Sequence, residues 1–420
     1  MAKIDLSFKD TFNKMEEEFN GNYKFVNGLG LIKYDGKVWN FISDNILERI
    51  IADWLGDNFS PSNVKKYFEA YKMYNSIEVY DLNKNKNHIA FTNGTFNIKS
   101  FKFEQDKWYK DEYTTTGFKF DYDEKAECPT FNKYLDEVML GDKELQAIIG
   151  EILGYCLLDD CRYERAFILY GEGATGKSVL LKVISDIWGS ENCSNVPFDR
   201  LNESFMRAGM YGKKINFSSE LESDLHNTAY FKAMVSGEEI DAQFKFKDVF
   251  KFKNTAKMLF AMNNLPAIKD KTSGTYRRLI IIPFERQFNP SERDVDLVNK
   301  ILKEKSGIIN IAFNSLKRLI DTNTFTYSLK SDKLLEEHKE NNDTVCLYLN
   351  ETYTIGTEQD YVECSELYER FSTYCKNNGF KALNNVNFFK RFYKFYPNSI
   401  KKRARVNGKL VYVVDNIQHI

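Results

Sequence analysis

A glycine-rich segment near the middle of the chain sets strict limits on the local fold. Residues 171–178 read Gly-Glu-Gly-Ala-Thr-Gly-Lys-Ser, that is, a glycine, four residues and then Gly-Lys-Ser. Residues 166–170, just before it, are apolar and of strand length. After it, apolar residues recur at helical spacing: Val179, Leu180, Val183, Ile184 and Ile187. The segment is therefore predicted to join a buried strand to the amino end of a helix.

This context of strand, loop and helix identifies the segment as a phosphate-binding P-loop. Gly176 lets the backbone approach phosphates, and the loop N–H groups and the helix terminus favour their negative charge. Lys177 is expected to reach the β- and γ-phosphates, and the Ser178 hydroxyl to bind Mg²⁺. The predicted cofactors are ATP and Mg²⁺. The predicted nucleotide-binding residues are Gly171, Glu172, Gly173, Ala174, Thr175, Gly176, Lys177, Ser178 and Val179.

Length and composition exclude several classes of protein. With 420 residues the chain is expected to form more than one domain. Its seven cysteines include no C-x-x-C pair, and its four histidines lack ligand spacing, so a structural zinc site is not expected. No apolar leader and no run of about eighteen apolar residues occurs, which predicts a cytosolic protein without a membrane span.

Two strands after the P-loop end in residues suited to hydrolysis of a triphosphate. Residues 213–220 form a short apolar strand that ends in Glu220, a candidate to polarise the attacking water and to contribute to the metal site. Ser219 stands where many P-loop enzymes carry a metal-binding Asp, so we expect it to act through water at most. Residues 257–262 form a buried strand that ends at Asn263, which is predicted to touch the γ-phosphate or the attacking water.

Residues 240–253, between these two strands, carry a pattern typical of a β-hairpin. Apolar and polar residues alternate, with a break at Lys247-Asp248 and aromatic residues on one face. Four lysines share the other face, and the first three are candidates for contacting DNA phosphates: Lys245, Lys247, Lys251 and Lys253. An amphipathic surface hairpin without a ligand is the alternative.

Two arginines precede a further buried strand at residues 279–284. A guanidinium from Arg277 or Arg278 could reach the ATP of a neighbouring subunit and stabilise charge on the phosphoryl group in transfer. An arginine pair at the start of a strand is more commonly just part of the protein surface.

The C-terminal part of the chain is strongly basic. From Arg370 to Val414 there are eleven Lys or Arg residues and no Asp or Glu, which indicates nucleic-acid binding or, alternatively, a solvated basic face. A leading helix near 345–350, helices at 363–378 and 387–396, and a hairpin at 400–414 have the layout of a winged helix. The DNA-binding candidates are Lys390, Arg391, Lys394, Lys401, Lys402, Arg403 and Arg405. The four aromatic residues of the second helix are predicted to be core residues: Phe388, Phe389, Phe392 and Tyr393.

The order of P-loop, strand with Glu220, basic hairpin, strand with Asn263 and arginine pair resembles the superfamily 3 helicases of the AAA+ class. It is most similar to the helicase half of phage and plasmid primase-helicases and to the poxvirus-type nucleoside triphosphatase, over about residues 85–420. The resemblance implies hexameric rings that translocate 3′ to 5′ on single-stranded DNA. It also implies Glu220 as water activator, Asn263 as sensor, Arg277 or Arg278 as a finger acting in trans, and the hairpin of residues 240–253 in the pore.

The sequence thus predicts an α/β protein with a P-loop core whose parallel-type sheet is flanked by helices. The expected division is an N-terminal α+β region of unknown role (1–115), a helical region (116–160), an AAA+ core (161–335), a polar linker near 338–343 and a winged-helix DNA-binding domain (345–420). No primase domain is evident, and Asp121-Tyr-Asp123 is assigned to the surface.

The predicted function is ATP-dependent DNA unwinding in the replication of a phage, plasmid or other mobile element, in the cytosol of a bacterial host. The predicted partners are single-stranded and forked DNA, further copies of the chain in a homo-hexamer, a replication polymerase or primase, and origin DNA. The alternatives are a replication initiator that uses ATP only for assembly, and a DNA-packaging or RNA-translocating motor.

Overall fold

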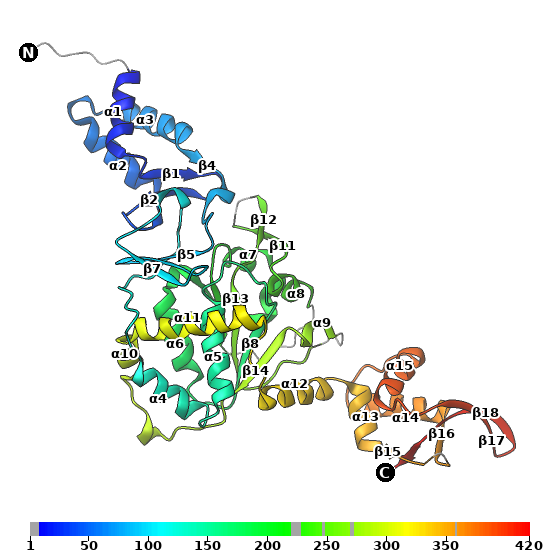
Figure 1. Cartoon of the computed structure of the whole chain (residues 1–420). Coiled ribbons are helices and arrows are strands. Elements are labelled where there is room, and N and C mark those ends of the chain that lie inside the picture. Colours follow the sequence, from blue (N-terminus) through cyan, green and yellow to red (C-terminus); the bar gives the residue numbers. More distant parts are fainter. Residues whose placement is uncertain (1–7, 220–227, 246–247, 269–272, 358) are drawn as a thin grey trace, which may run out of the picture.

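The structure is a computed structural model of the chain, and it describes residues 8–219, 228–245, 248–268, 273–357 and 359–420. Three groups of elements follow one another along the chain. An N-terminal group and a C-terminal group lie at opposite ends of a larger central group (Figure 1). Among the described residues, no helix combines the length and the apolar character that crossing a lipid bilayer requires.

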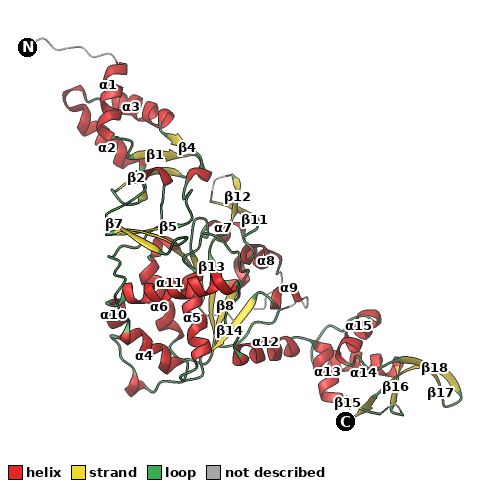
Figure 2. Ribbon diagram, viewed as in Figure 1, coloured by secondary structure: helices red, strands yellow, loops and turns green. Residues whose placement is uncertain are grey.

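A parallel five-stranded sheet forms the centre of the molecule. Its strands are β8 (Ala166–Tyr170), β9 (Cys193–Ser194), β10 (Ile215–Ser219), β13 (Lys257–Met262) and β14 (Leu279–Pro283). Their order across the sheet is β14-β8-β13-β10-β9, and every pair is parallel. Helices cover the sheet on both faces (Figure 2), which explains why its central strands read as continuous apolar runs. The prediction of an α/β fold with a parallel sheet is confirmed.

The side chains of β8 alternate between two hydrophobic cores. Phe167 and Leu169 pack into a core with the helices α4 (Pro129–Val138), α5 (Lys143–Tyr155), α6 (Lys177–Trp188) and α11 (Lys305–Thr322). Ala166 and Ile168 pack on the opposite face with α7 (Ser204–Ala208), α8 (Ala229–Val235) and the hairpin of β11 (Glu239–Gln243) and β12 (Val249–Lys253). The strand is thus fixed from both sides.

The helices α4 and α5 begin at residues that favour helix starts. Pro129 is the first residue of α4, and the Asp142 side chain caps α5 by accepting the backbone N–H groups of Glu144 and Leu145, both at 3.1 Å. A contact distant in sequence completes the start of α4. Glu304, between α10 (Leu297–Leu302) and α11, accepts the N–H groups of Thr130 and Phe131, each at 3.0 Å.

A small antiparallel sheet joins this central core from outside the parallel sheet. Its strands are β5 (His88–Phe91), β6 (Gly94–Asn97) and β7 (Lys102–Gln105). The chain turns at Thr92 and Asn93, and Gly94 pairs with Phe91 at the start of β6, where a Cβ would lie 2.3 Å from the Glu104 carbonyl oxygen. The ring of Phe96 stacks on Phe313 of α11, with centroids 3.6 Å apart, so residues 88–105 share the central core.

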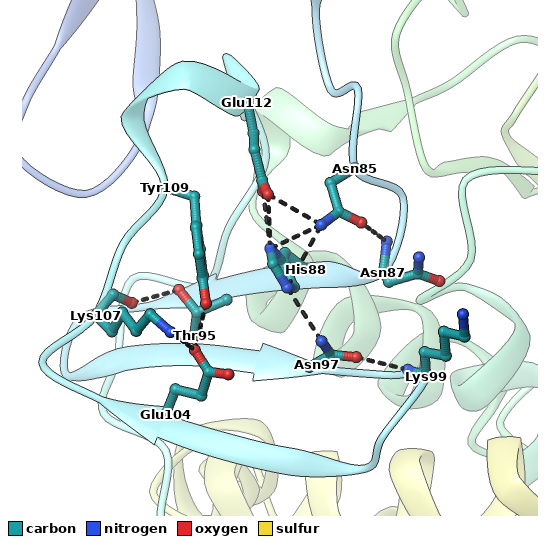
Figure 3. Close-up of polar contacts among 10 residues, drawn as sticks. All are labelled: Asn85, Asn87, His88, Thr95, Asn97, Lys99, Glu104, Lys107, Tyr109 and Glu112. Atoms are coloured by element: carbon teal, nitrogen blue, oxygen red, sulfur yellow. Dashed lines mark hydrogen bonds and ion pairs between the residues drawn. The ribbon is translucent and has the colours of Figure 1, made fainter.

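A polar network fixes the outer face of this small sheet (Figure 3). The His88 Nδ1 atom lies 2.8 Å from the Glu112 carboxylate, and the Asn97 amide nitrogen lies 3.1 Å from Nε2. Because a carboxylate can only accept, Nδ1 carries the proton and Nε2 accepts from Asn97. The ring also stacks on Tyr109 at 4.3 Å. Both ring nitrogens therefore have structural partners, which hold the 3₁₀ turn η3 (Lys110–Glu112) against β5.

The N-terminal group has a core of its own. The helices α1 (Phe8–Phe19), α2 (Asp44–Leu55) and α3 (Pro61–Tyr74) pack on a four-stranded sheet. Its strands, in spatial order, are β3 (Trp39–Ile42), β2 (Gly30–Tyr34), β1 (Tyr23–Val26) and β4 (Ser76–Ile77).

The C-terminal group contains the two helices and the hairpin that the sequence predicts. Its helices are α13 (Thr344–Thr352), α14 (Cys364–Asn377) and α15 (Asn385–Phe395), and its strands are β15 (Tyr353–Ile355), β16 (Tyr361–Glu363), β17 (Lys401–Val406), β18 (Lys409–Asp415) and β19 (Ile417–His419). Phe388 and Phe392 of α15 are fully buried in its core, with Phe389 and Tyr393 packed against them, as predicted. The hairpin of β17 and β18 turns at Asn407-Gly408.

The prediction of a polar linker at residues 338–343 is wrong. The helix α12 (Leu329–Asn341) continues through most of this stretch. The His338 ring is buried opposite Tyr276, and burial lowers its pKa to about 4, so it is neutral at physiological pH. The side-chain oxygen of Asn342 accepts the N–H of Ile268 at 3.1 Å. The polar composition of this stretch suggests a linker, but residues 338–341 form the end of α12, which packs on the central group.

The close packing of α5 on α11 generates a test of the fold. A Cβ at Gly154 would lie 2.7 Å from the Ala312 carbonyl oxygen and 2.7 Å from the Leu316 nitrogen, both backbone atoms that cannot move aside. We expect Gly154→Ala to destabilise the protein by about 1–2 kcal/mol, because overpacking outweighs the gain in helix propensity. Gly209→Ala is the control, since this glycine has φ −65° and its added Cβ would approach nothing closer than 3.3 Å. Equal denaturation midpoints for the two variants would contradict the packing.

Candidate functional site

The loop between β8 and α6 has a backbone that its glycines make possible. Gly171 and Gly176 have φ values of 157° and 95°, in the region that favours glycine. A Cβ at Gly171 would lie 2.2 Å from the Phe284 carbonyl oxygen, and one at Gly176 would lie 2.8 Å from Val138 Cγ1. Ala174 also has a positive φ of 61°. The loop is therefore pressed against its neighbours at both ends.

Three other elements hold the loop in place. The Tyr134 hydroxyl of α4 donates to the Gly176 carbonyl at 2.9 Å, and burial raises the pKa of this tyrosine. The N–H of Phe288, in the segment after β14, donates to the Ala174 carbonyl at 3.0 Å. The N–H of Gly171 donates to Met262 of β13 at 3.2 Å. Hydrogen bonds within the protein thus fix the loop, and no sequence pattern points to Tyr134 or Phe288.

Lys177 points into the hollow of this loop. Its Nζ atom donates to the carbonyls of Gly171 at 2.6 Å and Glu172 at 2.7 Å, and to the Asn263 side-chain oxygen at 3.1 Å. Its side chain is buried, and this desolvation lowers its pKa. Two predicted site residues, one at the start of α6 and one directly after β13, thus meet at hydrogen-bonding distance. Phosphate oxygens could replace the carbonyls around the ammonium group.

A cavity of about 780 Å³ opens beside the loop, which is a volume typical of small-molecule sites. Thr175, Ser178 and Asn263 reach it from the sheet side. Its far wall combines α4 with the segment after β14 and the start of α10. The lining residues of this wall are Thr130, Lys133, Tyr134, Glu137, Phe288, Glu292, Arg293, Asp294, Val295, Leu297 and Lys300. The cavity can accommodate a nucleoside next to the phosphate loop.

The predicted water activator, Glu220, lies outside the described residues, and so does Lys247 of the predicted basic turn. Ser219, the last residue of β10, pairs in register with Ala261 of the parallel strand β13. The strand β10 therefore ends at the sheet edge that carries Asn263 and the P-loop. Among the residues that the structure describes, no three His, Cys, Asp or Glu side chains form a group that could hold a metal ion.

The two predicted finger residues differ sharply in their surroundings. The Arg278 side chain is buried and donates to Gly274 at 2.6 Å, to Ser236 at 2.7 Å and to Glu164 at 3.0 Å. The Arg277 side chain is 64% exposed and lies 3.9 Å from Glu164. Both residues precede β14, at the opposite edge of the sheet from the P-loop. A five-residue strand spans roughly 17 Å, so neither guanidinium can serve the P-loop of its own subunit.

The predicted hairpin of residues 240–253 is confirmed as β11 and β12, paired antiparallel. Phe252 is buried, and the ring of Phe244 stacks on Phe250 with centroids 5.0 Å apart. Lys251 lies on the other face, 3.7 Å from Glu239. Lys245 follows β11, where the chain enters the turn.

The basic residues of the C-terminal group fall into two sets. On α15, Arg391 forms an ion pair with Asp343, while Lys390 and Lys394 line a second cavity of about 720 Å³. On the hairpin of β17 and β18, Lys402 pairs with Asp415 at 2.9 Å. The remaining candidates on this hairpin are exposed: Lys401, Arg403 and Arg405.

Two protein families match parts of the chain. Residues 13–140 match the family described as D5 N terminal like, and residues 169–278 match a family of unknown function, DUF5906. The first match begins well before the region in which the sequence shows its resemblance, and it runs across the predicted boundary at 115. The second begins at the end of β8 and covers the P-loop and the strands β9, β10 and β13 together with both arginines.

Viral proteins named as helicases are similar to about half of the chain. "Putative helicase L207/L206" of Acanthamoeba polyphaga mimivirus is 28% identical over 218 residues, which are 50% of this chain and 23% of that protein. "Putative helicase 184R" of Invertebrate iridescent virus 6 is 28% identical over 241 residues, which are 51% of this chain and 24% of that protein. The matched segment thus makes up about a quarter of each viral protein. Together with the family matches, these relatives support a helicase-like family for the chain.

The whole fold has a counterpart among solved structures. The A form apo structure of the NrS-1 C terminal region aligns with 97% of this chain and 98% of its own, with a TM-score of 0.56 and 15% identity. A second structure of this region, residues 305–718, gives a TM-score of 0.55 at 14% identity. At these identities the likeness concerns the fold alone.

Two glycines of the loop provide a matched test of its geometry. A Cβ at Gly171 would overlap the Phe284 backbone, and Gly171 has a positive φ. A Cβ at Gly173 would meet nothing within 4 Å. We expect Gly171→Ala to weaken binding of a fluorescent ATP analogue roughly tenfold or more, because the strained loop must open. Gly173→Ala should change the affinity by no more than about twofold. Equal affinities for both variants would show that the contact with Phe284 does not shape the site.

Proposed function

We propose that this chain is an ATP-dependent DNA helicase of the AAA+ superfamily 3 type that acts in the replication of a phage, plasmid or other mobile element. The observation that carries the proposal is the meeting of Lys177 and Asn263 beside the P-loop at one edge of a parallel sheet. The helicase names of the viral relatives add the nucleic-acid substrate.

The residues around the loop fit Mg-ATP. The Ser178 hydroxyl is exposed at the amino end of α6 and lines the cavity, where it would hold Mg²⁺ together with phosphate oxygens and water. The bound Mg²⁺ would neutralise charge on the phosphates. Lys177 would contact the β- and γ-phosphates, and Asn263, already at hydrogen-bonding distance from it, would orient the γ-phosphate or the attacking water. Glu220 would take the role of polarising that water.

The separation of Arg277 from its own P-loop supports catalysis between subunits. Because Arg277 is exposed and Arg278 is tied into the fold, Arg277 is the better candidate for a finger that acts in trans. A closed ring, in our proposal a hexamer, gives each P-loop such a partner. The hairpin of β11 and β12 would then project Lys245 and Lys247 toward DNA in the pore.

The C-terminal group supports binding to DNA outside the ring. Its sequence of α13, α14, α15 and the β17–β18 hairpin fits a winged helix, which we infer contacts forked or origin DNA. A replication polymerase or primase would be a functional partner.

Lys177→Ala is the first test of the site. We expect it to lower the rate of ATP hydrolysis by at least about 10²-fold and to abolish unwinding of a forked duplex with a 3′ single-stranded arm. Lys182→Ala is the matched control, because this lysine lies on the same helix, is exposed and pairs with Asp186. It should leave both activities within about twofold of wild type. Hydrolysis by wild type without unwinding would favour an initiator or a packaging motor.

Single substitutions and a complementation assay distinguish the roles of Arg277 and Arg278. We expect Arg277→Ala to reduce hydrolysis by about 10³-fold without loss of thermal stability, and Arg278→Ala to lower the melting temperature, because three hydrogen-bond acceptors lose their partner. Arg277→Ala subunits mixed with Lys177→Ala subunits should regain part of the activity, since each supplies what the other lacks. If the mixture stays inactive, the finger does not act in trans.

A further inference from the structure

One face of the β17–β18 hairpin gathers cations around an exposed aromatic ring. Arg403 lies opposite Tyr412 in the register, and Arg405 lies opposite Leu410. Because side chains alternate along a strand, Lys401 shares this face with the two arginines. Tyr412 is 45% exposed and Leu410 is 65% exposed. We call these five residues the hairpin face: Lys401, Arg403, Arg405, Leu410 and Tyr412.

The ring of Tyr412 is held in a fixed position on this face. The Lys401 Nζ atom lies 4.5 Å from the ring centroid and the Arg403 guanidinium 5.1 Å from it. Arg403 also donates to the Tyr412 hydroxyl at 2.8 Å. The strand that carries the ring is anchored by its neighbours Val413 and Val414, which are fully buried. A planar ring and its cations are thus presented together by a rigid strand.

The other basic surface of this group faces acidic residues of the same chain. Lys390, Arg391 and Lys394 of α15 line the cavity of about 720 Å³. Glu336, Glu340 and Asp343, from α12 and the residues after it, line the same cavity. The ion pair of Arg391 with Asp343 bridges the two sides. A phosphate chain at α15 would meet these carboxylates.

The β17–β18 hairpin, in contrast, lies away from the acidic end of α12. Figure 1 shows β17 and β18 on the side of the C-terminal group that is remote from α12 and from the central group. From Arg370 to Val414 the sequence contains no acidic residue. Asp415, at the end of β18, lies on the opposite face of the hairpin, where it pairs with Lys402 at 2.9 Å. The hairpin face therefore offers a phosphate chain positive charge without a carboxylate from β17 or β18 on the same face.

We propose that the hairpin face binds single-stranded nucleic acid. An unpaired base would stack on Tyr412, and Lys401, Arg403 and Arg405 would contact the flanking phosphates. A duplex would use the cations but not the ring, because its bases are stacked within the helix. This binding function goes beyond the proposed motor function, because the hairpin face lies outside the P-loop core and would bind nucleic acid without ATP.

The test compares three variants of the full chain, without nucleotide, by fluorescence anisotropy with a labelled oligo-dT. We expect Tyr412→Ala to weaken binding roughly tenfold, because it removes one base-stacking contact. Tyr412→Phe keeps the ring and loses only the hydrogen bond from Arg403, so it should bind within about twofold of wild type. Arg403→Gln should weaken binding and reduce the slope of log affinity against log salt by about 0.7, while Tyr412→Ala leaves the slope unchanged.

Two exposed lysines outside the predicted DNA-binding set provide the matched control. A double variant with Lys376→Gln and Lys381→Gln removes two positive charges from the same group and should leave oligo-dT affinity unchanged. On irradiation, an oligonucleotide that contains bromodeoxyuridine should crosslink to the peptide that carries Tyr412. The same titration with labelled oligo-rU shows whether the hairpin face binds DNA or RNA more tightly. Wild-type affinity in Tyr412→Ala, equal losses for a blunt duplex, or an adduct confined to α15 would each overturn the proposal.

These outcomes are independent of the motor function. ATP hydrolysis by Tyr412→Ala in the absence of DNA should equal that of wild type, because the substitution leaves the P-loop intact. A chain that binds oligo-dT through Tyr412 but does not hydrolyse ATP would refute the proposed helicase and leave the hairpin face standing.

Discussion

The parallel pairing of β8 with β13 on one side and β14 on the other is the constraint on which the rest of the structure depends. It brings the P-loop and Asn263 to one edge of the sheet and sends both arginines to the other. The alternating side chains of β8 divide the apolar residues into two cores, one under each layer of helices. The proposed catalysis between subunits is compatible with this strand order, because the P-loop and the exposed Arg277 lie at opposite ends of the same sheet.

Much of this arrangement could be predicted from the sequence because its signals are local. Asn407-Gly408 specifies a turn, Asp142 caps the helix that begins beside it, and the P-loop motif fixes the strand before it and the helix after it. The hairpin of residues 240–253 could be predicted equally well, because the alternation of apolar and polar residues and the break in it both lie within one short segment. The identity of the lysine and the asparagine at the site follows from the same local patterns.

Other features depend on contacts between distant segments, and no local pattern reveals them. Tyr134 and Phe288 close on the P-loop from residues about 40 positions before it and about 110 after it. The polar stretch around His338 reads as a linker, yet its ring is packed against Tyr276. The difference between Arg277 and Arg278 is likewise invisible in the sequence, because it is set by Ser236, Gly274 and Glu164.

The contact between Gly171 and the Phe284 carbonyl has a mechanical consequence. Phe284 directly follows β14, and Arg277 and Arg278 directly precede it. β14 is an edge strand of the parallel sheet, and it pairs along its whole length with β8. A change in the P-loop backbone that moved Phe284 would therefore act on the same short strand that carries the two arginines at its other end. In the proposed assembly, this strand would link the phosphate site of one subunit to the surface that it offers to the next.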